Sequence, residues 1–220
     1  MVYNRTPAME PARIAELLAP FLASAPGYPL KADDLKHISM YIDMLERWNA
    51  RVNLTAVRDA EAMVTRHFGE SLFAARHLFP GRSSAGVALA DVGSGAGFPG
   101  IPIKLWASDL QLTLIESNHK KAAFLREVSR ALAFTDIEVK VERVEALPIA
   151  SFDVVTLRAV ERFVDVLPVA ARLARPKGRL ALLISSAQRT VCETASGVLW
   201  QEPIPIPLSA SRILLIGSRE

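Results

Sequence analysis

The sequence is poor in cysteine and has no long apolar segment. Cys192 is the only cysteine among 220 residues, which excludes a disulfide within the chain and a cysteine-based metal cluster. No apolar run approaches the ~18 residues that a membrane span requires. His37 and His119 have no companions at metal-ligand spacing, so no metal site is expected. These absences favour a reducing, cytoplasmic setting without membrane association.

The charge is small overall but unevenly distributed. The net charge is only +3, whereas residues 157–220 carry nine basic and five acidic side chains. Much of this excess lies in a short segment that holds Arg172, Arg175, Lys177 and Arg179. Such a cluster attracts phosphate backbones. A solvated helix end, whose cations favour the C-terminal dipole, explains it equally well.

Hydrophobic patterning divides the chain into two parts. Up to residue 85, apolar residues recur at three- and four-residue spacing, as at Leu35, Ile38, Ile42 and Leu45, and this predicts helices. Asp59 predicts the start of a further helix. Residues 81–86 (GRSSAG) form the clearest linker. We therefore expect an N-terminal helical cap over residues 1–85 and a second domain over residues 86–220.

The second part alternates short apolar runs with helical segments. Strands are predicted at 87–90, 112–115, 137–141, 152–157 and 179–185, and helices at 120–132 and 163–174. This alternation predicts a doubly wound, Rossmann-like α/β fold whose sheet is mostly parallel. Apolar runs at 198–205 and 212–217 have no helix between them, so they predict a C-terminal antiparallel hairpin.

A glycine-rich segment, residues 91–100 (DVGSGAGFPG), follows the first predicted strand. Open α/β sheets bind ligands at this edge, and glycines let the backbone adopt positive φ and approach a ligand closely. Residues 95–100 match the dinucleotide pattern G-x-G-x-x-G. Read from Gly93, which follows the strand directly, the third position is Phe98 instead of glycine. An acidic residue, Asp91, followed by G-x-G-x-G suits a ligand without phosphates, such as S-adenosylmethionine. A purely structural turn is the remaining alternative.

Acidic and apolar residues after the first three strands extend this interpretation. Asp91 accepts bonds from a cationic aminocarboxylate moiety or orders the loop near it. Glu116 follows the end of the second strand. Its carboxylate is placed to accept hydrogen bonds from both ribose hydroxyls of either NAD or S-adenosylmethionine. Val144 and Glu145 follow the third strand, where they suit the face and the edge of an adenine ring. This pair favours the methyl donor. The sequence also shows no obvious second domain with a proton-transfer residue, which a nucleotide oxidoreductase would need.

Further segments surround the loop in a combination typical of one family. They are WNxxxNLTAVRD at 48–59, RH at 66–67, ESL at 70–72, DVGSGAGFPGIPI at 91–103, KAAFL at 121–125, RVE at 143–145 and RA at 158–159. Over about residues 40–185 the chain resembles the small-subunit ribosomal RNA guanine-N7 methyltransferases, also called glucose-inhibited division protein B. The Asn-Leu-Thr segment and the Phe-Pro-Gly-Ile-Pro continuation are the most specific parts of the resemblance.

The resemblance implies a class I methyltransferase fold and a cytoplasmic enzyme that uses S-adenosylmethionine. Its implied substrate is one guanine of small-subunit ribosomal RNA, either free or within the 30S subunit, and we expect a monomer. Arg143 and Arg158 resemble family arginines close to the reaction centre and are expected to position the substrate. Together with the residues derived above, the expected cofactor-binding set is Asp91, Gly93, Gly95, Phe98, Glu116, Val144, Glu145 and Arg158.

The sequence also departs from the family pattern. After the fifth strand the family often carries Lys-Gly, whereas residues 184–188 read ISSAQ here. One substrate-facing cation is therefore missing or supplied from elsewhere, for which Arg189 is a candidate. Glu70 occupies a place where the family more often has aspartate.

The predicted chemistry needs no general base. Guanine N7 has an available lone pair that attacks the sulfonium methyl directly, so the protein's task is to hold the reactants in line. The alternatives are a methyltransferase of small molecules or proteins, a nucleotide-dependent oxidoreductase, and an RNA-binding module whose nucleotide fold is vestigial. Structural alternatives exist for both arginines, because Arg158 could pair with Glu161, and Arg143 with neighbouring glutamates.

Overall fold

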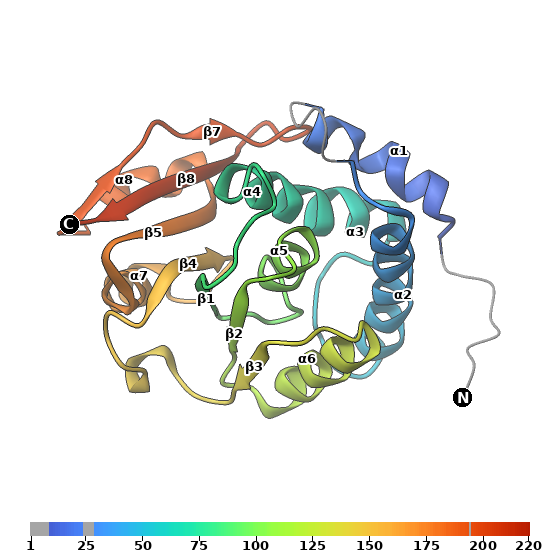
Figure 1. Ribbon diagram of the computed structural model, residues 1–220, viewed down its shortest axis with the longest axis horizontal. Coiled ribbons are helices and arrows are strands. Elements are labelled where there is room, and N and C mark those ends of the chain that lie inside the picture. Colours follow the sequence, from blue (N-terminus) through green and yellow to red (C-terminus); the bar gives the residue numbers. More distant parts are fainter. Residues whose placement is uncertain (1–8, 24–28, 194) are drawn as a thin grey trace.

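A computed structural model describes residues 9–23, 29–193 and 195–220. An eight-stranded sheet runs through the middle of the molecule with helices on both faces (Figure 1). The strands are β1 (Ala88–Val92), β2 (Gln111–Ile115), β3 (Ile137–Lys140), β4 (Phe152–Arg158), β5 (Ala174–Ser185), β6 (Val198–Trp200), β7 (Ile204–Pro205) and β8 (Arg212–Arg219). Among the described helices, none combines the length and apolarity needed to cross a membrane.

The strand order confirms the expected doubly wound fold. It runs β3-β2-β1-β4-β5-β8-β6, and the first five strands in this order are parallel. Alternate residues of β1 enter different cores, with Leu89 in one and Ala90 in the other, because both faces of a parallel sheet are covered. The carboxyl ends of β1, β2 and β4 consequently meet at one edge.

The C-terminal strands form the expected antiparallel hairpin, with one refinement. β8 lies between β5 and β6 and is antiparallel to both. The first arm, expected to be continuous over 198–205, is divided into β6 and β7, both of which pair with β8. The fifth strand also starts earlier than expected, because Ala174 already pairs with Phe152 of β4. The register then shifts before regular pairing begins at Arg179.

The helices of the sheet layers follow from apolar stripes. One face carries α5 (Gly100–Trp106) and α6 (His119–Ala131), and the other carries α7 (Phe163–Leu173). Asn118 caps α6, since its side chain accepts hydrogen bonds from the backbone N–H groups of Lys120 and Lys121. The remaining short elements are η2 (Val144–Ala146), η3 (Ser186–Gln188) and α8 (Arg189–Glu193).

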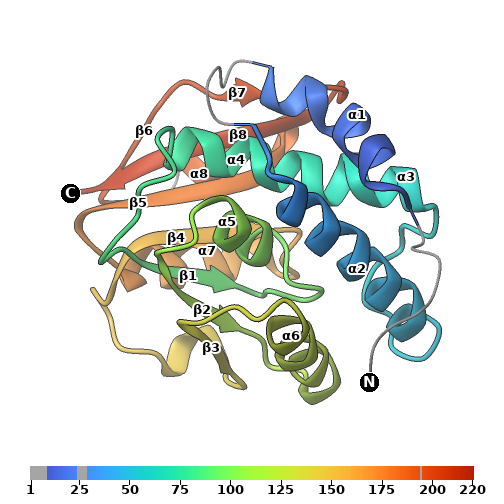
Figure 2. The ribbon, with the colours of Figure 1, turned by 45° about the vertical axis from the view of Figure 1, so that its right-hand side comes forward.

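The N-terminal helices α1 (Pro11–Leu22) and α2 (Ala32–Asn49) gather at one side of the molecule, away from α7 and β6 (Figures 1 and 2). Trp48 of α2 meets Phe124 of α6 edge to face, with ring centroids 5.6 Å apart. The hydrophobic core on this side runs without interruption from α1 and α2 to the sheet. The predicted linker at 81–86 connects α4 (Glu70–Leu78) to β1, but the apolar packing continues across it.

A helical run from residue 60 to residue 78 connects the cap to the sheet. It comprises α3 (Ala60–Met63), a π-helical segment η1 (Val64–Gly69) and α4 (Glu70–Leu78). Asp59 caps α3 as expected, because its Oδ1 accepts a hydrogen bond from Ala62 N at 2.7 Å. The π-helical segment was not expected from the sequence, and such wider turns are frequent at functional sites.

Candidate active site

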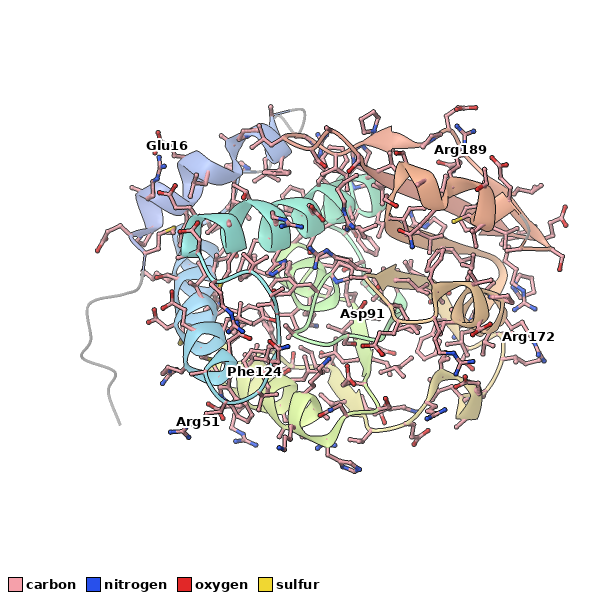
Figure 3. The ribbon with its side chains drawn as sticks, turned by 180° about the vertical axis from the view of Figure 1, so that it is seen from behind. Glu16, Arg51, Asp91, Phe124, Arg172 and Arg189 are labelled. Atoms are coloured by element: carbon pink, nitrogen blue, oxygen red, sulfur yellow. The ribbon has the colours of Figure 1, made fainter. Side chains whose placement is uncertain are left out.

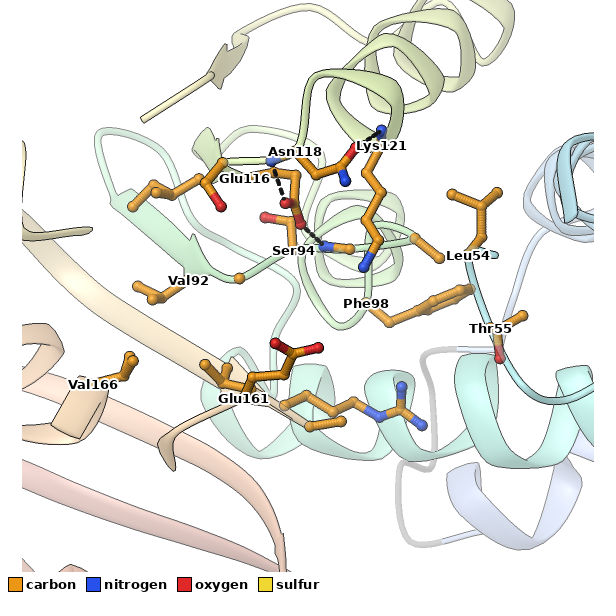
Figure 4. A pocket seen from close by; sticks show the side chains of 18 of the residues that line it. Leu54, Thr55, Val92, Ser94, Phe98, Glu116, Asn118, Lys121, Glu161 and Val166 are labelled. Carbon is orange, nitrogen blue, oxygen red and sulfur yellow. Dashed lines mark hydrogen bonds between the residues drawn. The ribbon is translucent and has the colours of Figure 1, made fainter. Parts of the chain in front are cut away.

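A cavity of about 870 Å³ opens at the carboxyl ends of β1, β2 and β4 and is closed on one side by the cap (Figure 4). In the close-up, Glu116 and Asn118 lie on one side of the cavity, and Leu54 and Thr55 lie on the other, beyond Phe98. The expected site residues that line it are Arg143, Arg158, Gly93, Gly95, Phe98, Glu116, Val144 and Glu145. Asp91 is the exception, since it is not among the lining residues.

The glycine loop is shaped by positive φ angles and by close neighbours. Gly93 has a φ of +68°, and a Cβ there would lie 3.2 Å from Val160 Cγ2. Gly97 has a φ of +89°, and a Cβ there would lie 2.3 Å from the Tyr41 hydroxyl. Larger residues are therefore excluded at both positions. Gly93 lines the cavity, so the absence of a side chain at this position leaves its backbone open to a ligand.

Asp91 lies beneath this loop with 0% exposure. Its Oδ1 accepts a hydrogen bond from Thr156 Oγ1 at 2.8 Å, and its Oδ2 accepts one from Gly100 N at 3.2 Å. Burial raises the pKa of Asp91 to about 6, although these hydrogen bonds oppose the shift. Asp91 was expected either to bind the aminocarboxylate moiety of the cofactor or to order the loop. Its hydrogen bonds order the loop, and its carboxylate does not line the cavity.

Glu116 joins the glycine loop to the turn after β2. Its Oε2 accepts a hydrogen bond from Gly95 N at 2.9 Å, and its Oε1 accepts one from Asn118 N at 2.7 Å (Figure 4). Each carboxylate oxygen retains a further lone pair, so Glu116 can still accept hydrogen bonds from a ribose. The predicted ribose contact therefore fits the geometry, with the carboxylate held in a fixed position.

The cap also holds the glycine loop directly. Tyr41 of α2 is buried, its hydroxyl donates a hydrogen bond to Ala96 O, and its ring stacks on Phe98 at a centroid distance of 5.4 Å. Burial raises the pKa of Tyr41 well above its ordinary value, so the hydroxyl remains a donor. No sequence pattern indicated this contact of Tyr41.

Arginines surround one buried carboxylate on the wall of the cavity that lies opposite the glycine loop and Glu116. Glu70 Oε2 accepts hydrogen bonds from Arg212 Nη2 at 3.1 Å and from Arg158 Nε at 3.4 Å. Arg158 Nη2 also donates to Arg66 O at 2.7 Å, and the Arg158 side chain is only 11% exposed. The suggested pairing of Arg158 with Glu161 is therefore wrong. Arg158 contacts Glu70, which is far away in the sequence.

His67 completes this wall in a single tautomer. Arg158 Nη2 lies 3.0 Å from His67 Nδ1, and a guanidinium can only donate, so Nδ1 is the acceptor. Burial, reinforced by the nearby positive charges of Arg158 and Arg66, lowers the pKa of His67 to about 3. The imidazole is thus neutral with its proton on Nε2, and Nε2 donates to Thr55 Oγ1 at 2.7 Å.

Two basic features differ from expectation. Arg189 pairs with Glu193 and Glu202 and does not line the cavity, so it is not the replacement cation. Arg212 of β8 lines the cavity instead, a contribution that the strand pattern could not reveal. Figure 3 shows Arg172 and Arg189 toward the side of the molecule away from α1 and α2.

The cluster at 172–179 lies at the amino end of β5, opposite the cavity edge, and its members are partly committed to structure. Arg175 pairs with Asp153 at 2.7 Å, and Arg179 donates to Leu78 O at 2.9 Å.

Arg143 is exposed at the rim of the cavity, and within the described residues it forms no ion pair with a neighbouring glutamate. Arg143 is therefore available to a ligand.

The fold and the glycine-loop site together define an α/β methyltransferase. The magnesium protoporphyrin IX methyltransferase from Synechocystis with bound SAM has the same fold, with a TM-score of 0.62, 15% sequence identity, and coverage of 84% of this chain and 97% of that chain. Residues 34–198 match the family model described as rRNA small subunit methyltransferase G.

Two curated relatives agree with this match. The ribosomal RNA small subunit methyltransferase G from Chloroflexus aggregans is 39% identical over 203 residues, covering 86% of this chain and 84% of the relative. The protein of the same name from Stenotrophomonas maltophilia is 38% identical over 201 residues, covering 90% of each. The chain therefore belongs to the rRNA small subunit methyltransferase G family. The expected family, enzyme class and methyl donor are confirmed, and the oxidoreductase alternative is wrong.

Proposed function

We propose that this enzyme transfers a methyl group from S-adenosylmethionine to N7 of one guanine in small-subunit ribosomal RNA. The observation that carries the proposal is a cavity with two different walls. One wall is formed by the glycine loop and Glu116, and the other by Arg158, Arg212 and His67. The names of the curated relatives support the RNA substrate, and the fit of the loop to an adenosyl ligand supports the donor.

The state of the buried ionisable groups favours N7 as the acceptor atom. His67 cannot remove a proton, because Nδ1 already accepts from Arg158 and Nε2 carries the ring proton. Both oxygens of Glu116 are engaged by backbone N–H groups. N7 of guanine carries a free lone pair and no proton, so its methylation requires neither group as a base. An exocyclic amine would have to lose a proton during transfer.

The chain's own residues supply position. When bound, S-adenosylmethionine provides an electrophilic methyl group on a sulfonium. Glu116 and the loop amides hold the adenosyl half, while Arg158 and Arg212 give the other wall a positive character that suits RNA phosphates. Holding two reactants in line can lower a barrier by roughly 7–11 kcal/mol. No covalent or proton-transfer step on the protein is needed.

The finer assignments follow from this function. We infer a cytoplasmic monomer that acts on RNA, either free or within the 30S subunit. The predicted contacts of Gly93, Phe98, Val144 and Glu145 with the cofactor, and of Arg143 with the substrate, belong to the same proposal. The division into a cap at 1–85 and a catalytic domain at 86–220 is retained as part of this proposal.

The test incubates the purified protein and its Glu116→Ala variant with methyl-labelled S-adenosylmethionine and either 30S subunits or their naked RNA. Nucleoside analysis should find the label as 7-methylguanosine, with the variant strongly reduced. Label that survives ribonuclease treatment would instead support a protein or small-molecule substrate. Intact RNA binding without calorimetric cofactor binding would support a vestigial fold. Absence of label at guanine N7 in both substrates would end the proposal.

A further inference from the structure

The hydroxyl of Thr55 has one hydrogen for which the described residues provide no acceptor. Thr55 Oγ1 accepts a hydrogen bond from His67 Nε2 at 2.7 Å and another from Val57 N at 3.1 Å. A hydroxyl has two acceptor lone pairs and one donor hydrogen, so both lone pairs are occupied. Within the described residues no acceptor for the remaining hydrogen is found. The network therefore forces Thr55 to act as a donor.

The donor is held rigidly at the wall of the cavity. Thr55 is half-buried and lines the cavity on the cap side. Asn49 fixes its backbone, because Asn49 Oδ1 accepts from Thr55 N at 3.1 Å and Asn49 Nδ2 donates to Thr55 O at 3.0 Å. The direction of the hydroxyl is fixed in turn by His67, whose tautomer Arg158 determines. A preorganised single donor of this kind is suited to recognising a single acceptor atom.

We propose that the Thr55 hydroxyl recognises O6 of the target guanine, an assignment that rests on the proposed function. O6 lies beside N7 on the same edge of guanine and is an acceptor, whereas adenine presents an amino group there. A donor that cannot become an acceptor discriminates between the two bases, because two opposed donors leave a buried polar group unpaired. Thr55 thus provides base specificity without occupying N7.

A neutral donor also fits the reaction better than the neighbouring cations. An arginine that binds guanine bidentately takes both O6 and N7, which would block the attacking lone pair. Methylation at N7 makes the ring cationic, so an adjacent guanidinium would oppose the product, whereas a hydroxyl adds no charge. The nearby arginines are in any case committed, since Arg158 and Arg212 both bind Glu70.

The position of Thr55 favours the substrate over the cofactor. In the close-up, Phe98 lies between Thr55 and the side of the cavity that holds Glu116 and Ser94 (Figure 4). The loop and Glu116 mark the cofactor half, so Thr55 faces the other half. His67, which binds Thr55, also contacts Phe98, with ring centroids 4.9 Å apart.

The experiment compares the wild-type enzyme with Thr55→Val and Thr55→Ser on RNA that carries guanine, inosine or 2,6-diaminopurine at the target position. All three bases have N7, but only 2,6-diaminopurine replaces O6 with an amino group. We expect the wild-type enzyme to prefer guanine over 2,6-diaminopurine by about 100-fold in kcat/KM. Thr55→Val should lower kcat/KM on guanine about tenfold while leaving 2,6-diaminopurine unchanged, so that the preference narrows.

The controls separate recognition from folding and from cofactor binding. Thr55→Ser retains the hydroxyl and should retain the preference, and the guanine-to-inosine ratio should be the same in all three enzymes. Melting temperature and S-adenosylmethionine affinity are measured for each enzyme. An equal loss on guanine and 2,6-diaminopurine, or a loss explained by weaker cofactor binding, overturns the assignment alone. A wild-type enzyme that labels no guanine overturns the proposed function, and the assignment falls with it.

Discussion

The neutral, buried His67 makes a quantitative prediction about stability at low pH. Its pKa is about 3 in the folded protein, compared with an ordinary value of 6.5. Between these pH values the unfolded chain binds a proton at His67 that the folded chain does not bind. The stability that depends on the neutral ring is complete above the unfolded pKa and is lost as the pH falls below it. The affected window lies between about pH 6.5 and about pH 3.

The magnitude follows from the distance between the unfolded pKa and the working pH. At about pH 5 the difference from 6.5 is about 1.5 units, so lowering the pH from about 8 to about 5 costs about 2 kcal/mol from His67 alone. Asp91 acts in the opposite direction, because its raised pKa means that the folded protein gains stability as this carboxyl is protonated. The contribution of His67 is therefore measured as a difference between variants.

The assay is urea unfolding of the wild-type protein and His67→Asn at about pH 8 and about pH 5. Asn retains an acceptor near Nδ1 but cannot titrate, so the variant should lose about 2 kcal/mol less than the wild type over this interval. Asp91→Asn provides the matched control with the opposite sign. If the free-energy difference between wild type and His67→Asn is the same at both pH values, His67 is not a neutral buried ring and the tautomer argument fails.

Substitutions at three further positions test the remaining contacts. Glu116→Ala removes the acceptor of Gly95 N–H and of the ribose, so cofactor affinity in calorimetry should fall at least about tenfold; unchanged affinity would mean that the ribose lies elsewhere. Tyr41→Phe leaves Ala96 O buried without a donor and should lower the free energy of unfolding by about 1–3 kcal/mol in urea denaturation. Arg158→Ala leaves a buried charge cluster incomplete and should cost about 3 kcal/mol. Arg158→Lys should restore little of that loss in thermal unfolding, because a lysine cannot span the same acceptors. Full recovery would show that only its charge matters.

Local patterning predicted the sheet well because its signals lie within single segments. Apolar runs followed by glycine or an acidic residue placed β1 and β2 within one or two residues, and Asp59 marked a helix start by its capping chemistry. The irregular start of β5 was missed because residues 175–178 are polar and contain a proline and a glycine. The pairing of Ala174 with Phe152 of β4, ahead of the register shift, depends on contacts that no local pattern encodes.

The candidate site was predicted where motifs carry it and missed where the chain folds back on itself. The glycine loop and Glu116 lie close in sequence to the strands that present them. Arg212 and Glu70 meet only because β8 inserts beside β5, and nothing near either residue indicates the other. For the same reason, Arg189 was a reasonable but wrong candidate for the additional cation. Long-range ion pairs of this kind need a register that only the folded sheet provides.

The contact between Tyr41 and the glycine loop has a thermodynamic consequence. Helix α2 of the cap contacts the glycine loop, the segment proposed to bind the methyl donor, through Tyr41. Donor binding and RNA binding therefore involve parts of the protein that are in direct contact. Any preference of RNA for one placement of α2 must appear as a change in donor affinity, and donor binding must alter RNA affinity by the same factor. Measuring one affinity with and without the other ligand therefore determines the coupling in both directions.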